Sequence, residues 1–211
     1  MAKSIYSVHP GVQMVQDAIA QLRTKTGRDL QEWIKFIKKE GPKDVPARRD
    51  WLKKQHGLGT NYAWWLADWS VGKGEEDGDP EKYLAAAVKY VDGMYAGKKA
   101  GLKPIHDKLI ALSRGLGKDV RVCPCQTIVP LYREHVFAQV KPSTNTRIDF
   151  GLALTKFVKE KKGKIPAQLI DTGGLAKKDR ITHRIAIESL DQIDDEVKKW
   201  LKMAYELDAP E

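Results

Sequence analysis

The stretch from Thr127 to Leu154 constrains the fold of this chain more than any other. It holds two runs rich in β-branched and aromatic residues, on either side of a turn cluster at Pro142 to Asn145. Such a pattern is typical of an antiparallel strand pair. In the second run every other residue from Ile148 to Leu154 is large and apolar, so these side chains share one strand face. We therefore expect this pair at the centre of the main core.

The rest of the second half predicts further strands and helices around that pair. Short strands are expected at Val120–Cys123 and Ile181–Ile187, and helices from Pro80 and around Ile105–Leu112. Ser189 and Gln192 fit a capping box, which predicts that the last helix begins there. The second half is therefore expected to be an α+β domain, an antiparallel sheet packed with helices.

In the first half, apolar residues recur at the spacing of a helix, and glycines interrupt this pattern. Thr26-Gly27, Gly41-Pro42 and Gly57-Leu58-Gly59 divide it into four predicted helices, the first of them Pro10–Lys25. A polar, Gly-rich, acidic stretch follows and reads as a linker. We expect a four-helix bundle domain at 1–72, a linker at 73–79 and an α+β domain at 80–211.

The charge of the chain is strongly basic and unevenly spread. Its 211 residues carry 37 Lys plus Arg against 28 Asp plus Glu, a net charge of +9. Lys98–Lys164 has 15 basic and 5 acidic residues, a net +10, whereas Ile165–Glu211 has 7 and 10, a net −3. A basic surface favours nucleic acid or another polyanion as partner. The alternative is a solvated face that only keeps the protein soluble.

The expected cellular location of the protein follows from the absence of a membrane span, a secretory signal and a disulfide framework in the sequence. The longest apolar run, Ala63–Ala67, is far shorter than the ~20 residues of a membrane span, and the N-terminus does not resemble a secretory signal. Cys123 and Cys125 are the only cysteines, too few for a disulfide framework. We expect a cytoplasmic protein with no membrane association.

Both halves resemble families without an assigned activity. K-T-G-R-D-L-Q-E-W at 25–33 and W-L-K-K-Q-H-G-L-G at 51–59 resemble a small helical bacterial domain. F-A-Q-V-K-P at 137–142, R-I-D-F-G-L-A-L at 147–154, I-T-H-R-I at 181–185 and a final W-L-K-M-A-Y resemble an uncharacterised domain also found appended to predicted nucleases and transport-like proteins. The resemblance implies a tandem of two such domains and transfers no catalytic residue.

A glycine turn in the first half is the leading candidate site. Gly57-Leu58-Gly59, with Ala63 four residues on, resembles the hairpin of helix-hairpin-helix DNA-binding proteins, where backbone N–H groups at a helix N-terminus bind phosphate. The alternative is an ordinary turn between helices. The candidate nucleic-acid or anion-binding residues are Lys53, Lys54, His56, Gly57, Gly59 and Thr60.

A second candidate is a polar pocket beside the sheet, lined by Arg133, Asp149, His183 and Arg184. Asp149 could act as an acid or base, but a salt bridge to Arg147 or Arg184 explains it better. His183 lies among apolar strand positions and is more simply a core residue.

The motifs of known catalytic and cofactor sites do not occur in this sequence. There is no P-loop, G-x-G-x-x-G or G-x-S-x-G, and the two cysteines lack the further ligands that zinc needs. We expect no cofactor, no metal and a non-enzymatic binding protein for nucleic acid or another polyanion. The alternative is a small-molecule or anion-binding protein, or an enzyme, that uses the polar pocket.

Overall fold

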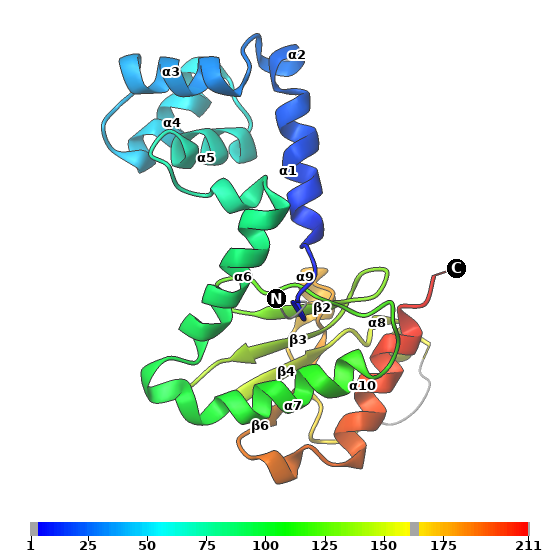
Figure 1. The fold of residues 1–211 in the computed structure, drawn as a ribbon. Helices are drawn as coiled ribbons and strands as arrows, with labels where there is room; N and C mark the ends of the chain where they lie inside the picture. Colours follow the sequence, from blue (N-terminus) through cyan, green and yellow to red (C-terminus); the bar gives the residue numbers. More distant parts are fainter. Residues whose placement is uncertain (1–3, 161–164, 211) are drawn as a thin grey trace. The chain divides into compact units, whose positions relative to one another are not determined.

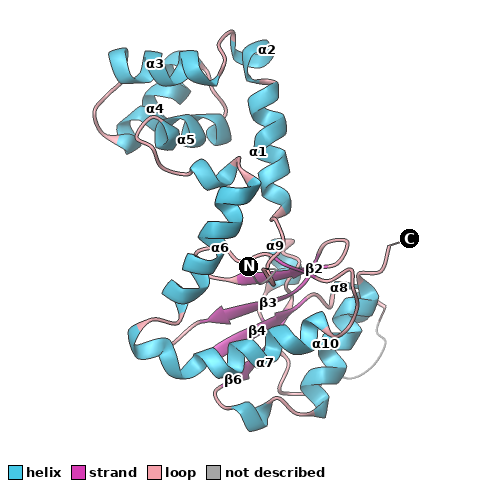
Figure 2. Ribbon diagram, in the orientation of Figure 1, coloured by secondary structure: helices cyan, strands magenta, loops and turns pink. Residues whose placement is uncertain are grey.

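The computed structural model describes residues 4–160 and 165–210. The chain divides into two compact units, a helical unit of Val8–Tyr83 and an α+β unit of Leu84–Glu211 with Met1–Ser7. Figure 1 follows the chain through both, and Figure 2 shows strands in only the second of them. The predicted fold class, a small helical bundle followed by an antiparallel sheet packed with helices, is confirmed.

The helical unit is built from short helices that end at glycine turns. They are α1 (Pro10–Ala20), α2 (Leu22–Thr26), α3 (Leu30–Glu40), α4 (Val45–His56), α5 (Thr60–Trp69) and the 3₁₀-helix η1 (Glu75–Asp77), after which α6 (Pro80–Met94) begins. The predicted first helix is thus two helices, separated at Gln21. The predicted linker contains η1. Leu22, Trp33, Ile37, Leu52 and Leu66 form the core of this unit.

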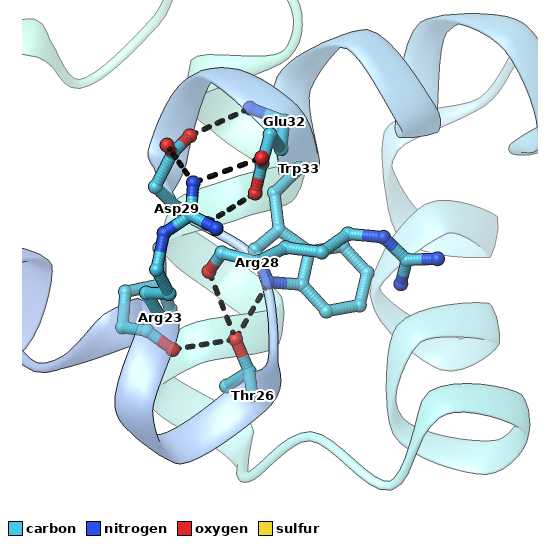
Figure 3. Close-up of polar contacts among 7 residues, drawn as sticks. Arg23, Thr26, Arg28, Asp29, Glu32 and Trp33 are labelled. Atoms are coloured by element: carbon cyan, nitrogen blue, oxygen red, sulfur yellow. Dashed lines mark hydrogen bonds and ion pairs between the residues drawn. The ribbon is translucent and has the colours of Figure 1, made fainter.

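The turn between α2 and α3 explains the K-T-G-R-D-L-Q-E-W pattern (Figure 3). Gly27 adopts the left-handed conformation with φ 80°, and the Thr26 hydroxyl accepts a 2.7 Å hydrogen bond from the buried indole of Trp33. Asp29 and Glu32 form a capping box, and Arg23 bonds to both carboxylates. The motif therefore stabilises a turn and closes the N-terminus of α3 with negative charge.

The α+β unit follows α6 with helices, a six-stranded sheet and a closing helix. Its remaining helices are η2 (Gly97–Leu102), α7 (Lys103–Arg114), α8 (Thr155–Lys159), α9 (Gly174–Lys177), η3 (Leu190–Gln192) and α10 (Asp195–Leu207). Its strands are β1 (Arg121–Val122), β2 (Val129–Tyr132), β3 (Val136–Pro142), β4 (Ile148–Leu152), β5 (Ile170–Asp171) and β6 (His183–Ile187). The strand order is β1-β2-β3-β4-β6-β5, with all pairs antiparallel.

The predicted strand pair is the centre of this sheet. β3 and β4 pair with Val140 opposite Phe150, and Ile148, Phe150 and Leu152 are fully buried. α7 and α10 contribute to the same core and lie together on one side of the sheet (Figure 1). The alternation read from the sequence is therefore confirmed.

Two element boundaries differ from the prediction because local hydrogen bonds override the pattern. The run before the turn is two strands rather than one, since Arg133 N donates to His135 O and reverses the chain between β2 and β3. The capping box of Ser189 and Gln192 forms, but on η3. The last helix begins later, because the Asp194 carboxylate caps α10 by accepting from Val197 N.

We predict that Thr26→Val destabilises the protein by about 1–3 kcal/mol. The substitution keeps the branched shape but leaves the buried Trp33 N–H without an acceptor. Urea unfolding followed by circular dichroism measures the effect. Thr26→Ser keeps the hydroxyl and is the matched control, expected to remain within about 1 kcal/mol of wild type. Equal losses in both variants would contradict the role given to this hydroxyl.

Candidate functional site

The glycine turn, Gly57 to Gly59, connects α4 to α5 and leaves the start of α5 open. Gly57 is left-handed with φ 66°, and Gly59 is the extended N-cap residue of α5. A Cβ added to either glycine would meet no atom within 4 Å. Gly59 has no side chain to cap the helix, and the first internal bond of α5 is from Ala63 N to Gly59 O. The N–H groups before Ala63 therefore have no acceptor within the helix, and Gly59, Thr60 and Asn61 are exposed.

The four other predicted residues flank this turn: three precede it on α4 and one follows it on α5. One of the four, His56, faces inward. Lys53 and Lys54 are exposed in the last turn of α4, and Thr60 is the exposed first residue of α5. The Lys54 ammonium lies 3.4 Å from the Asp50 carboxylate. His56 instead packs into an aromatic cluster of the helical unit. The open site therefore consists of backbone N–H groups, two lysines and one hydroxyl.

The inward position of His56 is explained by its neighbours. Its ring centroid lies 4.3 Å from that of Trp51 and 5.2 Å from that of Phe36. Its Nε2 is buried and has no hydrogen-bond partner in the described part of the chain. Burial and the nearby Arg28 guanidinium lower its pKa. His56 is thus a neutral packing residue, which sequence proximity to the lysines could not reveal.

Only two of the residues predicted to line a polar pocket, Asp149 and Arg184, bond to each other. Asp149 Oδ1 accepts hydrogen bonds from Arg184 Nη1 at 2.9 Å and from Arg147 Nε at 3.0 Å. His183 is buried, with Nδ1 3.0 Å from Thr182 Oγ1, and burial lowers its pKa. Because neighbouring strand residues point to opposite faces, His183 and Arg184 lie on opposite sides of β6. The structure thus joins Asp149 to Arg184 but not to His183.

Arg133 belongs to a third polar group, at the end of α10. Its Nε donates to Asp119 Oδ2 at 2.8 Å and its Nη1 to Tyr205 O at 3.0 Å. The Tyr205 hydroxyl donates to Asp119 Oδ1 at 2.8 Å. The hydrogen bonds from Arg133 and Tyr205 lower the pKa of Asp119. Arg133 therefore fastens α10 to the turn between β2 and β3.

A hollow that the sequence did not predict lies near this helix end. It has a volume of about 370 Å³, and Leu175, Leu207, Lys156, Lys178, Arg180 and Asp208 are among its lining residues. Asp208 is 6% exposed and accepts from Arg180 Nη2 and from the backbone N of His135. Since its residues come from distant parts of the chain, no local motif could have indicated it.

The two cysteines have the environment of packing residues. Cys123 is fully buried and Cys125 is half-buried, and neither forms a disulfide. Burial raises the pKa of the Cys123 thiol to about 12, so it stays protonated at neutral pH. Across residues 4–160 and 165–210, no group of three or more His, Cys, Asp or Glu side chains is arranged to hold a metal ion.

Comparisons with known families agree with the two-part organisation. A family model described as Domain of unknown function (DUF4287) matches residues 14–70, and one described as Domain of unknown function (DUF5655) matches residues 91–208. The expected tandem of two uncharacterised families is confirmed. No curated protein and no solved structure matches the chain. None of the described helices is long and apolar enough to cross a membrane.

We predict that Asp149→Asn destabilises the protein by about 1–3 kcal/mol, because two guanidinium groups lose the charge that their hydrogen bonds depend on. Asp107→Asn is the matched control. Asp107 pairs with Lys103 across one helical turn on the exposed surface, where such a pair contributes about 0.5 kcal/mol or less. Urea unfolding of both variants provides the comparison. If Asp149→Asn lowers the free energy of unfolding no more than Asp107→Asn does, the Asp149 ion pairs do not stabilise the sheet.

A buried histidine that the sequence did not single out predicts a pH effect. His106 Nδ1 lies 3.0 Å from the Tyr95 hydroxyl in the core, and burial lowers the pKa of His106 to about 4. An unfolded histidine has a pKa of about 6.5. Between these values only the unfolded chain takes up the proton. The stability contributed by neutral His106 is therefore complete above pH 6.5 and is lost as the pH falls towards 4.

We expect wild type to lose roughly 2–3 kcal/mol more unfolding free energy than His106→Gln between pH 7 and pH 4.5. Urea unfolding at the two pH values measures the difference. Parallel losses in both proteins would contradict a neutral, buried His106.

Proposed function

The chain belongs to the family described as Domain of unknown function (DUF5655), and since that description assigns no activity, we propose a function from the geometry. The protein binds nucleic acid or another polyanion through the glycine turn of its helical unit, without catalysing a reaction. The observation that carries this proposal is the open N-terminus of α5. The proposal keeps the bacterial, cytoplasmic setting expected from the sequence.

The chemistry of the turn suits a phosphate group. A helix N-terminus carries partial positive charge and N–H donors that point outward. With glycine at positions 57 and 59, no Cβ obstructs an approaching oxygen. Lys53 and Lys54 add two positive charges on the last turn of the preceding helix. These contacts would hold the phosphate backbone without reading bases.

Three helices of the chain begin with a capping carboxylate, unlike α5 and α7, which have no capping side chain. The start of α3 is closed by Asp29, that of α4 by Asp44 and that of α10 by Asp194, each through a carboxylate that accepts from a backbone N–H. A carboxylate in that position both occupies the donors and repels an anion. The start of α5 combines a glycine N-cap with nearby lysines and is therefore available to an anionic ligand.

The overall charge supports a polyanion as partner. The net charge is +9, and the segment Lys98–Lys164 alone has +10; Lys161, Lys162 and Lys164 of that segment lie outside the described residues. Positive charge raises the rate of encounter with nucleic acid and makes binding salt-dependent.

A second candidate function is binding of a small anionic molecule in the α+β unit. It is favoured by the hollow of about 370 Å³, whose lining combines apolar residues with more basic side chains (Lys156, Lys159, Lys178 and Arg180) than acidic ones (Asp179 and Asp208). A volume above about 300 Å³ is sufficient for a small ligand. This hollow is not formed by Arg133, Asp149, His183 and Arg184.

We predict that Gly59→Asp weakens binding of a fluorescent 16-base-pair duplex, in low salt, by roughly tenfold, the effect of about 1.4 kcal/mol. The extended Gly59 backbone and the open space around it accept this side chain, whose carboxylate would cap α5 and repel phosphate. Helix stability should be unchanged or a few tenths of a kcal/mol higher. Fluorescence anisotropy measures the affinity, and thermal unfolding checks the fold.

Gly59→Asn is the matched control, since its side chain has the same shape without the charge. It should retain more affinity than Gly59→Asp. If wild type binds no duplex at low salt, or if both variants bind as wild type does, the proposed function is contradicted.

A further inference from the structure

A second basic hollow lies in the α+β unit, and none of its lining residues was predicted as a site residue. We name it the lysine groove. It has a volume of about 500 Å³, and its basic lining residues are Lys98 and Lys99 at the start of η2 and Lys141 on β3. None of its lining residues is acidic. The groove therefore has a local charge of +3, which no carboxylate of the lining offsets.

The neutral polar residues of the groove are also suited to an anion. Gln126, Thr127, Ser143 and Asn145 line it from the segment before β2 and from the turn between β3 and β4. Their hydroxyl and amide groups are the donor types that, with lysine, contact phosphate and sugar oxygens in nucleic-acid complexes.

Two of the three lysines are available for a ligand. Lys99 Nζ donates to Pro142 O at 2.6 Å, so it helps to fix the turn against η2. Lys98 and Lys141 are exposed and have no ion-pair partner within residues 4–160 and 165–210. Asp149 pairs with Lys141 in the strand register, but its Oδ1 already accepts from Arg147 and Arg184.

The lining indicates which anionic ligand fits. Sites for small molecules are mostly apolar, whereas here Met94, Ala96 and Pro142 are the only apolar lining residues beside Gly93. Platforms for unpaired bases need aromatic side chains, and the groove is lined by none. Lysines with neutral donors and no aromatic ring match the phosphodiester backbone.

We propose that the lysine groove binds the phosphodiester backbone of a nucleic acid without reading its bases. The ligand class rests on the proposed function, but the site is a separate one, in the other unit of the chain. It gives the protein a second set of phosphate contacts, supplied by Lys98 and Lys141 and supported by the neutral donors that line the same groove.

The test compares the full chain with the double variant Lys98→Gln/Lys141→Gln. Each lysine that contacts phosphate contributes about one unit to the slope of log affinity against log salt concentration. The double variant should lower that slope by about 2. The loss of affinity between 50 and 200 mM salt then becomes roughly tenfold smaller than in wild type. Anisotropy titrations with the same fluorescent duplex measure both quantities.

Lys108→Gln/Lys118→Gln is the matched control. Both residues are exposed, belong to the same unit and line neither hollow, so this variant removes the same charge from elsewhere. Its slope should equal that of wild type. Equal slopes for the two double variants would overturn the lysine groove as a binding site. An effect seen with one duplex sequence but not with another of the same length would overturn backbone recognition.

The outcomes also separate the two proposals. A lower slope in Lys98→Gln/Lys141→Gln, with unchanged binding by Gly59→Asp, supports the groove and contradicts the glycine turn. The reverse pattern supports the glycine turn and contradicts the groove. Absence of duplex binding by wild type at low salt contradicts both.

Discussion

The pairing of β3 with β4 is the constraint on which the α+β unit depends. Its register places Ile148, Phe150 and Leu152 in the core that α7 and α10 complete. A shift by one residue would exchange the two faces of the strand and bring Asp149 into that core. The neighbouring β4–β6 pairing brings Arg184 to Asp149 on the other face, and the β3–β4 turn contacts η2 through Lys99, where the lysine groove lies. The hydrophobic pattern thus also determines where the charged residues meet.

The helical unit depends on two glycine turns that have opposite surroundings. At Gly27 the turn is followed by a helix whose N-terminus is closed by Asp29, Glu32 and Arg23 (Figure 3). At Gly57 the turn is followed by Gly59, so that the N-terminus of α5 has only backbone donors and nearby lysines. The contacts at the first turn are explained by the stability that they give to α3. The second leaves donors without a capping side chain at a place where one would stabilise the helix, and these donors are the ones to which we assign the proposed anion binding.

The sequence predicted features that depend on neighbouring residues. Strand alternation from Ile148 to Leu152, the capping box of Ser189 and Gln192 and the glycine turn at Gly57 all follow from local rules. It failed where distant groups decide which side chains meet. Arg133, for example, bonds to Asp119 and Tyr205, which lie 14 and 72 residues away.

The same limit applies to the sites. The open turn at Gly57–Gly59 could be read from consecutive residues, although the inward position of His56 could not, because it results from packing against Phe36 and Trp51. The lysine groove combines residues from three separated segments, and its lysines are individually ordinary. Only the pairing of β3 with β4 and the contact of Lys99 with Pro142 bring them to one place.

Mapping of the bound surface by amide NMR is the most direct measurement of the central claim. In a titration of the full chain with a short duplex at low salt, the account predicts large shifts for the backbone amides of Gly59, Thr60 and Asn61, reversed by added salt. The amides at the closed N-terminus of α3, from Leu30 to Glu32, should not shift and serve as the internal reference. Equal shifts at both helix starts, or none at α5, would contradict the account.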